Sequence, residues 1–144
     1  MEQVTFKIST MKKLFLAIII CGFAFNASAQ APKPQWVTIK SENLKCWECK
    51  QRLEEYLLRA NGTQMDGGMI QRKYNLIKGE IRVQYWPDRT NPNLIKTVMA
   101  NAGFDADEIK ATEESYKTLP PACKRAAEGG GPKKGKPCHL EPQN

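Results

Sequence analysis

Aromatic residues are scarce in this sequence, and its basic residues form no cluster. Phe, Trp and Tyr make up 8% of the 144 residues, and the 22 Lys and Arg residues, which give a formal net charge of +7, are scattered along the chain. A nucleic-acid-binding surface is therefore not indicated, and we expect no nucleic-acid partner. With 41% apolar and 26% charged residues, the composition also excludes a membrane-spanning protein and a wholly disordered chain.

The apolar run near the N-terminus is too short to span a membrane. It extends from Leu14 to Phe25, follows the charged start Met11-Lys12-Lys13, and precedes the small residues Ala27-Ser28-Ala29. This pattern predicts a secretory signal peptide within a leader of residues 1–29, with Met11 as the true start. The mature protein is expected in the periplasm or cell envelope, with secretion to the medium as the second choice and no stable membrane insertion.

Four cysteines remain once Cys21 is assigned to the leader: Cys46, Cys49, Cys123 and Cys138. An even number of cysteines in an exported protein suggests disulfides, and four cysteines allow three connectivities. Metal binding is the competing interpretation, and the residues around the cysteines must decide between the two.

The first two cysteines lie where a strand pattern gives way to a helix pattern. Residues 36–40 alternate apolar and polar side chains, whereas apolar residues after Cys49 recur at steps of three and four. Cys46 and Cys49 are therefore predicted at the start of a helix. The positive end of the helix dipole favours thiolate, which is the form that binds metal or attacks a disulfide.

The mature chain is predicted to fold as an α+β domain over residues 35–112. A helix is expected at 47–61, and a second opens at Asn91-Pro92 and stops at Asn101-Ala102-Gly103. Strands are expected at 36–41, 69–75, 80–85 and 104–111. The order β-α-β-β-α-β is the ferredoxin-like pattern, in which both helices cover one face of a four-stranded antiparallel sheet.

Residues 113–144 have a different character. Leu119-Pro120-Pro121 interrupts any regular element, and residues 129–137 are rich in Gly, Pro and Lys. We expect a flexible basic tail that adds little to the core and carries Cys123, Cys138 and His139. Cys123 is expected either to reach back to the first two cysteines or to pair with Cys138.

These motifs resemble the heavy-metal-associated domain family, of the soluble copper chaperone and periplasmic mercury-binding type. The family motif Gly-Met-x-Cys-x-x-Cys corresponds to Asn43-Leu44-Lys45-Cys46-Trp47-Glu48-Cys49, with Asn in place of Gly and Leu in place of Met. The family's second loop, Ala-Gly-Tyr or Ala-Gly-Phe, corresponds to Ala102-Gly103-Phe104. The resemblance covers residues 36–111.

The resemblance implies a metal-binding protein rather than an enzyme. Cys46 and Cys49 would bind the metal, Cu(I) first, with Zn(II) and Hg(II) as alternatives. Cys123 would be a possible further ligand, and Cys138 and His139 weaker ones. Leu44, Lys45 and Phe104 would surround the site. Trp47 would contact a partner such as a metal-transporting membrane ATPase or another envelope metal protein.

Two alternatives remain open for the Cys-x-x-Cys pair. One is a thiol–disulfide oxidoreductase in which Cys46 is the exposed nucleophile. The other is a small interaction domain that is stabilised by disulfides and keeps a vestigial metal site.

We predict that the mature exported protein begins at Gln30, because cleavage follows the small residues at 27–29. N-terminal sequencing of the protein from the cell envelope checks this. A mature chain that still begins at Met1 or Met11, or a lipid attached to Cys21, would contradict the assignment.

Overall fold

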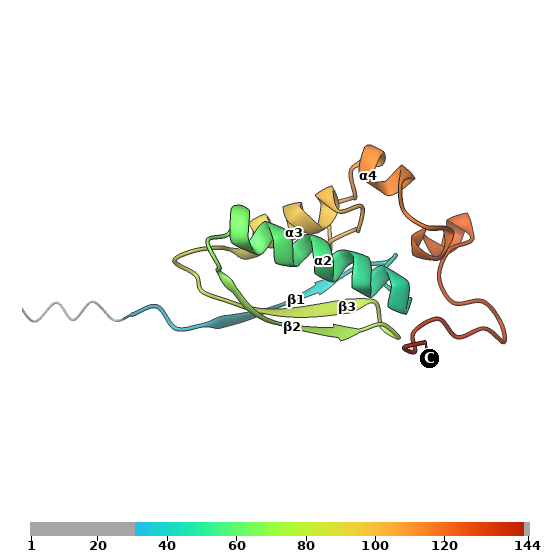
Figure 1. The fold of residues 1–144 in the computed structure, drawn as a ribbon, viewed down its shortest axis with the longest axis horizontal. Helices are drawn as coiled ribbons and strands as arrows, with labels where there is room; N and C mark the ends of the chain where they lie inside the picture. Colours follow the sequence, from blue (N-terminus) through green and yellow to red (C-terminus); the bar gives the residue numbers. More distant parts are fainter. Residues whose placement is uncertain (1–30, 143–144) are drawn as a thin grey trace, which may run out of the picture. The chain divides into compact units, whose positions relative to one another are not determined.

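A computed structural model describes residues 31–142 of the chain (Figure 1). The leader, the expected cleavage site and Cys21 lie outside this range. The described residues from Pro32 onward form one compact unit. Its elements in chain order are β1 (Gln35–Lys40), α2 (Trp47–Thr63), β2 (Met69–Asn75), β3 (Glu80–Tyr85), α3 (Pro92–Asn101) and α4 (Glu113–Lys117), followed by the 3-10 turns η1 (Pro121–Cys123) and η2 (Ala126–Glu128).

The sheet is antiparallel, with β3 between β1 and β2. Both α2 and α3 lie on the same side of it (Figure 1). On β3, Ile81, Val83 and Tyr85 are buried while Arg82 is exposed, as the alternating pattern predicts. The expectation of an α+β fold with an antiparallel sheet is confirmed, and the helix and strand positions agree with the sequence patterns to within about two residues.

The prediction of a fourth strand at 104–111 is wrong. Asp107 has a positive φ of 53°, and Ala106 and Ile109 form an isolated bridge around a turn. Beside β1, the Asp107 N–H donates to the Lys40 carbonyl (2.8 Å) and the Asp107 carboxylate accepts from the Lys40 N–H (2.8 Å). Asp107 thus pairs with both backbone groups of Lys40 at the end of β1, and the turn replaces a strand because aspartate favours turns over strands.

The tail is attached to the domain rather than separate from it. Tyr116, Leu119 and Cys123 are all buried within the same core as α2 and α3. The expectation that the tail adds little to the core is therefore wrong for residues 113–125. The apolar residues there are too few and too widely spaced to give a periodic signal, so their burial could not be read from the pattern.

Gly103 makes this attachment possible. Its φ is +95°, and a Cβ atom added there would lie 2.9 Å from the Ser115 carbonyl oxygen of α4. A side chain would therefore meet both backbone strain and a steric clash. The glycine of the Ala102-Gly103-Phe104 loop thus lets the backbone of α4 approach the end of α3.

A buried ion pair fastens the next part of the tail. Arg125 donates two hydrogen bonds of 2.8 Å to the carboxylate of Asp105, whose side chain is 3% exposed. Burial by itself would raise the pKa of Asp105. Hydrogen bonds from Arg125 and from the Ala111 N–H, with the charges of Arg125 and Lys110, outweigh it and hold that pKa below its ordinary value.

None of the helices in residues 31–142 has the length and apolarity needed to cross a membrane.

We predict that Arg125→Met destabilises the domain by about 3 kcal/mol near neutral pH, because it leaves a buried carboxylate without its partner. Since the native pKa of Asp105 is depressed, its contribution is present above the ordinary value of about 3.9 and is lost as the pH falls through the lower native value. The deficit of Arg125→Met should therefore shrink in acid. Urea unfolding at neutral and acidic pH measures it.

Lys117→Met is the matched control. It removes the exposed Lys117–Glu113 pair, whose side chains are 76% and 91% exposed, and should cost only about 0.5 kcal/mol. Equal effects of the two substitutions would show that the Asp105–Arg125 pair does not anchor the tail.

Candidate metal centre and its disulfide cap

The Cys-x-x-Cys segment begins helix α2, as the sequence predicts. Cys46 is the N-cap residue, with an extended backbone (φ −115°, ψ 152°), and Cys49 lies in the first turn. Leu44 is fully buried beneath the loop, in the position where the family motif has methionine. The helix therefore fixes the spacing of the two sulfur-bearing side chains, and the core beneath them fixes their direction.

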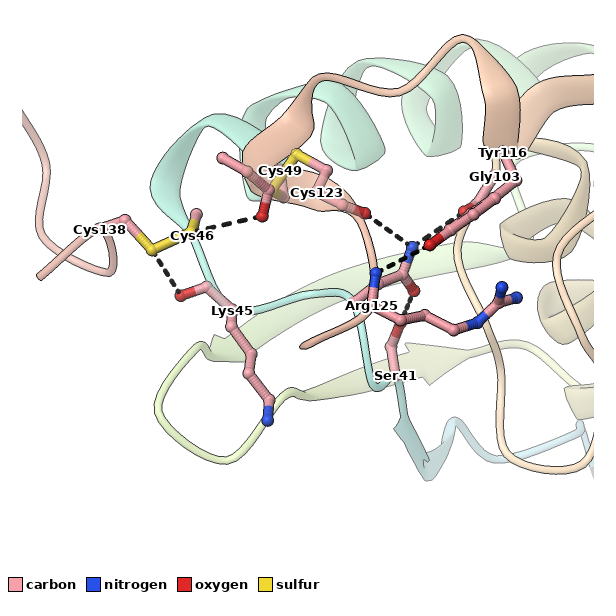
Figure 2. Close-up of a disulfide and its surroundings, with 11 residues drawn as sticks. Ser41, Lys45, Cys46, Cys49, Gly103, Tyr116, Cys123, Arg125 and Cys138 are labelled. Carbon is pink, nitrogen blue, oxygen red and sulfur yellow. Dashed lines mark hydrogen bonds between the residues drawn. A yellow bond between two sulfur atoms is a disulfide. The ribbon is translucent and has the colours of Figure 1, made fainter. Parts of the chain in front are cut away.

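All four cysteines in the described part of the chain form disulfides, and each bond joins the helix start to the tail (Figure 2). Cys46 pairs with Cys138, and Cys49 pairs with Cys123, with Cα–Cα distances of 4.6 and 5.4 Å. Of the two alternatives for Cys123, the structure shows the one that brings it back to the Cys-x-x-Cys segment, as a disulfide partner; its role as a further metal ligand stays a prediction. The alternative pairing of Cys123 with Cys138 is wrong.

The two disulfides differ in their surroundings. Cys49 and Cys123 are both 0% exposed, so the inner disulfide is part of the core. In the outer disulfide Cys46 is 1% exposed, but Cys138 is half-buried and belongs to a segment whose neighbours at 132–137 are all exposed. A thiol reductant from solvent therefore reaches the outer bond, through the Cys138 sulfur, more readily than the inner one.

A buried asparagine connects the helix start to the tail. The Asn43 side-chain amide donates to the carbonyls of Gly103 (3.0 Å) and Cys123 (3.1 Å). Its oxygen accepts from the Asp105 N–H (3.0 Å) and the Ser41 hydroxyl (3.3 Å). The hydrogen-bonding capacity of this 2%-exposed residue is thus fully used.

Asn43 stands where the family motif has glycine, and no local pattern in the sequence pointed to its role as a link between three segments.

Of the residues expected near the sulfurs, Phe104 lies in the core with them and Lys45 does not. Phe104 is fully buried in the same core cluster as Cys46 and Cys49. The Lys45 side chain runs away from both disulfides (Figure 2) and packs over Gly79 of the β2–β3 hairpin. The structure therefore gives the Lys45 ammonium no position from which to neutralise charge on the sulfurs.

Trp47 and His139 line an open groove of about 620 Å³ beside the outer disulfide. The Lys50 ammonium lies 3.8 Å from the centre of the Trp47 ring. Deeper in the groove, Glu54 receives hydrogen bonds from Arg72 and from the Tyr74 hydroxyl. Burial would raise the pKa of Glu54, but these two hydrogen bonds and the positive charges of Arg72 and Lys50 hold it below its ordinary value.

The oxidised chain offers no thiolate for a metal. Within residues 31–142 no group of three or more His, Cys, Asp or Glu side chains is arranged to hold a metal ion. A disulfide sulfur has neither the hydrogen of a thiol nor the negative charge of a thiolate. The contacts from Cys46 Sγ to the Ala122 carbonyl (3.7 Å) and from Cys138 Sγ to the Lys45 carbonyl (3.8 Å) are therefore packing contacts. Reduction of both disulfides would return these four sulfurs to thiols, which are soft ligands once they are deprotonated.

No family model matches the sequence, and no curated protein matches it. Solved structures with a partly similar fold include oxidised MerP from Ralstonia metallidurans CH34 (15% identity, TM-score 0.44) and a CopZ metallochaperone (24% identity, TM-score 0.43). A third is a putative copper-ion-binding protein from Bacillus anthracis str. Ames (21% identity, TM-score 0.45).

These likenesses cover 52%, 50% and 53% of this chain and 96%, 98% and 99% of the respective solved chains. The shared region is therefore about half of this protein. At these identities and TM-scores the likeness assigns neither a metal nor a partner to the chain.

We predict that limited reduction opens the Cys46–Cys138 bond before the Cys49–Cys123 bond, because thiol–disulfide exchange requires access to a sulfur. Partial reduction, alkylation and peptide mapping by mass spectrometry identify the first cysteines labelled. First labelling at Cys49 and Cys123 would contradict the order. The fully oxidised digest serves as the control and should contain the 46–138 and 49–123 linked peptides.

Proposed function

We propose that this protein is an exported binding module, not an enzyme, which holds a soft metal ion between the thiolates of Cys46 and Cys49 when its disulfides are reduced. The observation that carries the proposal is the position of the pair: both residues lie at the first turn of α2, one as N-cap, on a buried scaffold. Cu(I) is the first candidate for the metal, with Zn(II) and Hg(II) as alternatives.

The donor chemistry supports a soft ion. Thiolates prefer Cu(I) and related soft cations, whereas Zn(II) generally requires four ligands for a closed site. Two thiolates from one helix turn satisfy a low-coordinate ion and leave room for a partner's thiol to enter before the first ligands leave. Transfer to a metal-transporting membrane ATPase or another envelope metal protein fits this arrangement, with Trp47 in the adjacent groove as the docking contact.

The oxidised chain is then the closed form. Each sulfur of the Cys-x-x-Cys pair is bonded to a tail cysteine, so the metal site opens only when a thiol reductant cleaves these bonds. Redox state, rather than metal availability by itself, would control binding.

A second candidate is a disulfide-stabilised interaction domain. The specific observation in its favour is that the inner disulfide lies wholly in the core, as structural disulfides do. The oxidoreductase alternative is less well supported, because Cys46, its proposed nucleophile, is 1% exposed. An insulin-reduction assay tests the oxidoreductase, and Cu(I) titration separates the other two.

We predict that the reduced protein binds one Cu(I) per chain and that the oxidised protein binds none, because the oxidised sulfurs are not available as thiolates. Anaerobic titration against a competing Cu(I) chelator, followed by native mass spectrometry, measures the stoichiometry. Thiol counts before and after the titration confirm that the redox state is unchanged.

The matched pair of variants is Cys46→Ser/Cys49→Ser and Cys123→Ser/Cys138→Ser, which each remove two thiols. The first should lose tight Cu(I) binding and the second should keep a Cu(I) site. If the first variant binds Cu(I) as tightly as the parent, the site lies elsewhere and the proposed function is wrong.

A further inference from the structure

The two tail cysteines are held at the helix start by different means. Cys123 is fastened by contacts that do not depend on its disulfide. Its carbonyl accepts a hydrogen bond from the Asn43 amide (3.1 Å), and its N–H donates to the carbonyl of Pro120, the residue just before η1 (2.9 Å). Buried Leu119 precedes it and the Asp105–Arg125 ion pair follows it. These noncovalent contacts on both sides remain when the disulfide is reduced.

Fewer noncovalent contacts hold Cys138 in place. Among the described residues after Cys123, through residue 142, none is buried. The backbone contact at Cys138 is the hydrogen bond from the Trp47 N–H to its carbonyl. The preceding stretch is exposed and rich in Gly, Pro and Lys. Once the outer disulfide is cleaved, chain entropy favours release of this segment.

Cys123 also lies beside the Cys-x-x-Cys pair, directly at Cys49 and through its neighbour Ala122 at Cys46. Its Cα is 5.4 Å from that of Cys49, and the carbonyl of the preceding residue, Ala122, is 3.7 Å from Cys46 Sγ. Metal–sulfur bonds are about 2.3 Å long. The three cysteines therefore lie together at the start of α2, and binding one ion between them requires rotation of their side chains once the disulfides are reduced.

We propose that the reduced chain contains a preformed three-thiolate site made of Cys46, Cys49 and Cys123, and that Cys138 is its removable cap. The ligand class is a soft ion that accepts three-coordination by sulfur, with Cu(I) as the probe. The inference rests on the proposed function and deepens it. A third thiolate from the tail slows release of the metal ion, so the protein stores the ion rather than transferring it rapidly.

The site forms in two steps, reduction of the disulfides and then binding of the metal ion. Each disulfide takes two electrons and two protons from a thiol reductant, which leaves as its own disulfide, so opening both bonds consumes four electrons. On binding, each of the three ligating thiols forms a sulfur–metal bond and releases one proton to solvent. Cys138 remains a protonated, accessible thiol.

The first test uses the unmodified mature chain, anaerobically reduced and loaded with one Cu(I). Alkylation followed by peptide mapping should label Cys138 and leave the other three cysteines protected. X-ray absorption at the copper edge should give three sulfur neighbours. Rapid labelling of Cys123 together with two sulfur neighbours would overturn the proposal, and neither readout depends on a variant that must fold.

The second test compares Cys123→Ser with the matched control Cys138→Ser, both reduced and both checked for native circular dichroism. Cys123→Ser should weaken Cu(I) binding by about tenfold or more, since even the loss of an outer-shell partner of a metal site costs that much. Cys138→Ser should leave the affinity unchanged. An unchanged affinity in Cys123→Ser, or an equal loss in Cys138→Ser, would overturn the proposal.

The Cys46→Ser/Cys49→Ser variant separates this failure from failure of the proposed function. If it binds Cu(I) like the parent, the proposed function fails. If it loses binding while Cys123→Ser does not, the two-thiolate site stands and the three-thiolate inference fails.

Discussion

The side-chain amide of Asn43 is the interaction on which the arrangement of this protein depends. It joins the loop before α2, the loop after α3 and the tail at Cys123 through hydrogen bonds that use all its donors and acceptors. In a buried, weakly polarisable environment such a network is strong when complete and costly when any member is missing. Because Asn43 joins three segments at once, it holds Cys123 beside the Cys-x-x-Cys pair by contacts that are separate from the disulfides.

The two disulfides reinforce this arrangement, and the loop closed by the inner bond lies within the loop closed by the outer one. The outer bond spans 92 residues and the inner one 74, so the two separations differ by 18. In the chain-entropy model the first long cross-link is worth about 4.5 kcal/mol, and the second closes an effective loop worth about 3 kcal/mol. Whichever bond is cleaved first removes the smaller share of the stabilisation, and cleavage of the outer bond leaves the tail attached through Cys49–Cys123.

The tail has two parts that are held by different contacts. Residues 113–125 belong to the core through Tyr116, Leu119, Cys123 and the Asp105–Arg125 pair. The later residues are held by the outer disulfide and the hydrogen bond to Trp47. Under the proposed function, a reductant first releases the second part and exposes Cys46, and a further reduction frees the inner pair. The protein can thus pass from a closed to a metal-competent form without unfolding its sheet.

Much of the domain followed from local pattern. Alternation set β3, the residues Asn91 and Pro92 set the start of α3, and the change from strand to helix periodicity placed Cys46 and Cys49 at a helix start. These features depend on neighbours within a few residues, so the sequence determined them by itself. The fourth strand was predicted wrongly because residues 106–109 form a turn in which Asp107 pairs with Lys40, the last residue of β1. The burial of Leu119, the disulfide partners and the role of Asn43 were decided only by the tertiary structure. The disulfides and the hydrogen bonds that the Asn43 amide donates join atoms 60 or more residues apart, and no local pattern records which distant carbonyl or sulfur a side chain will meet.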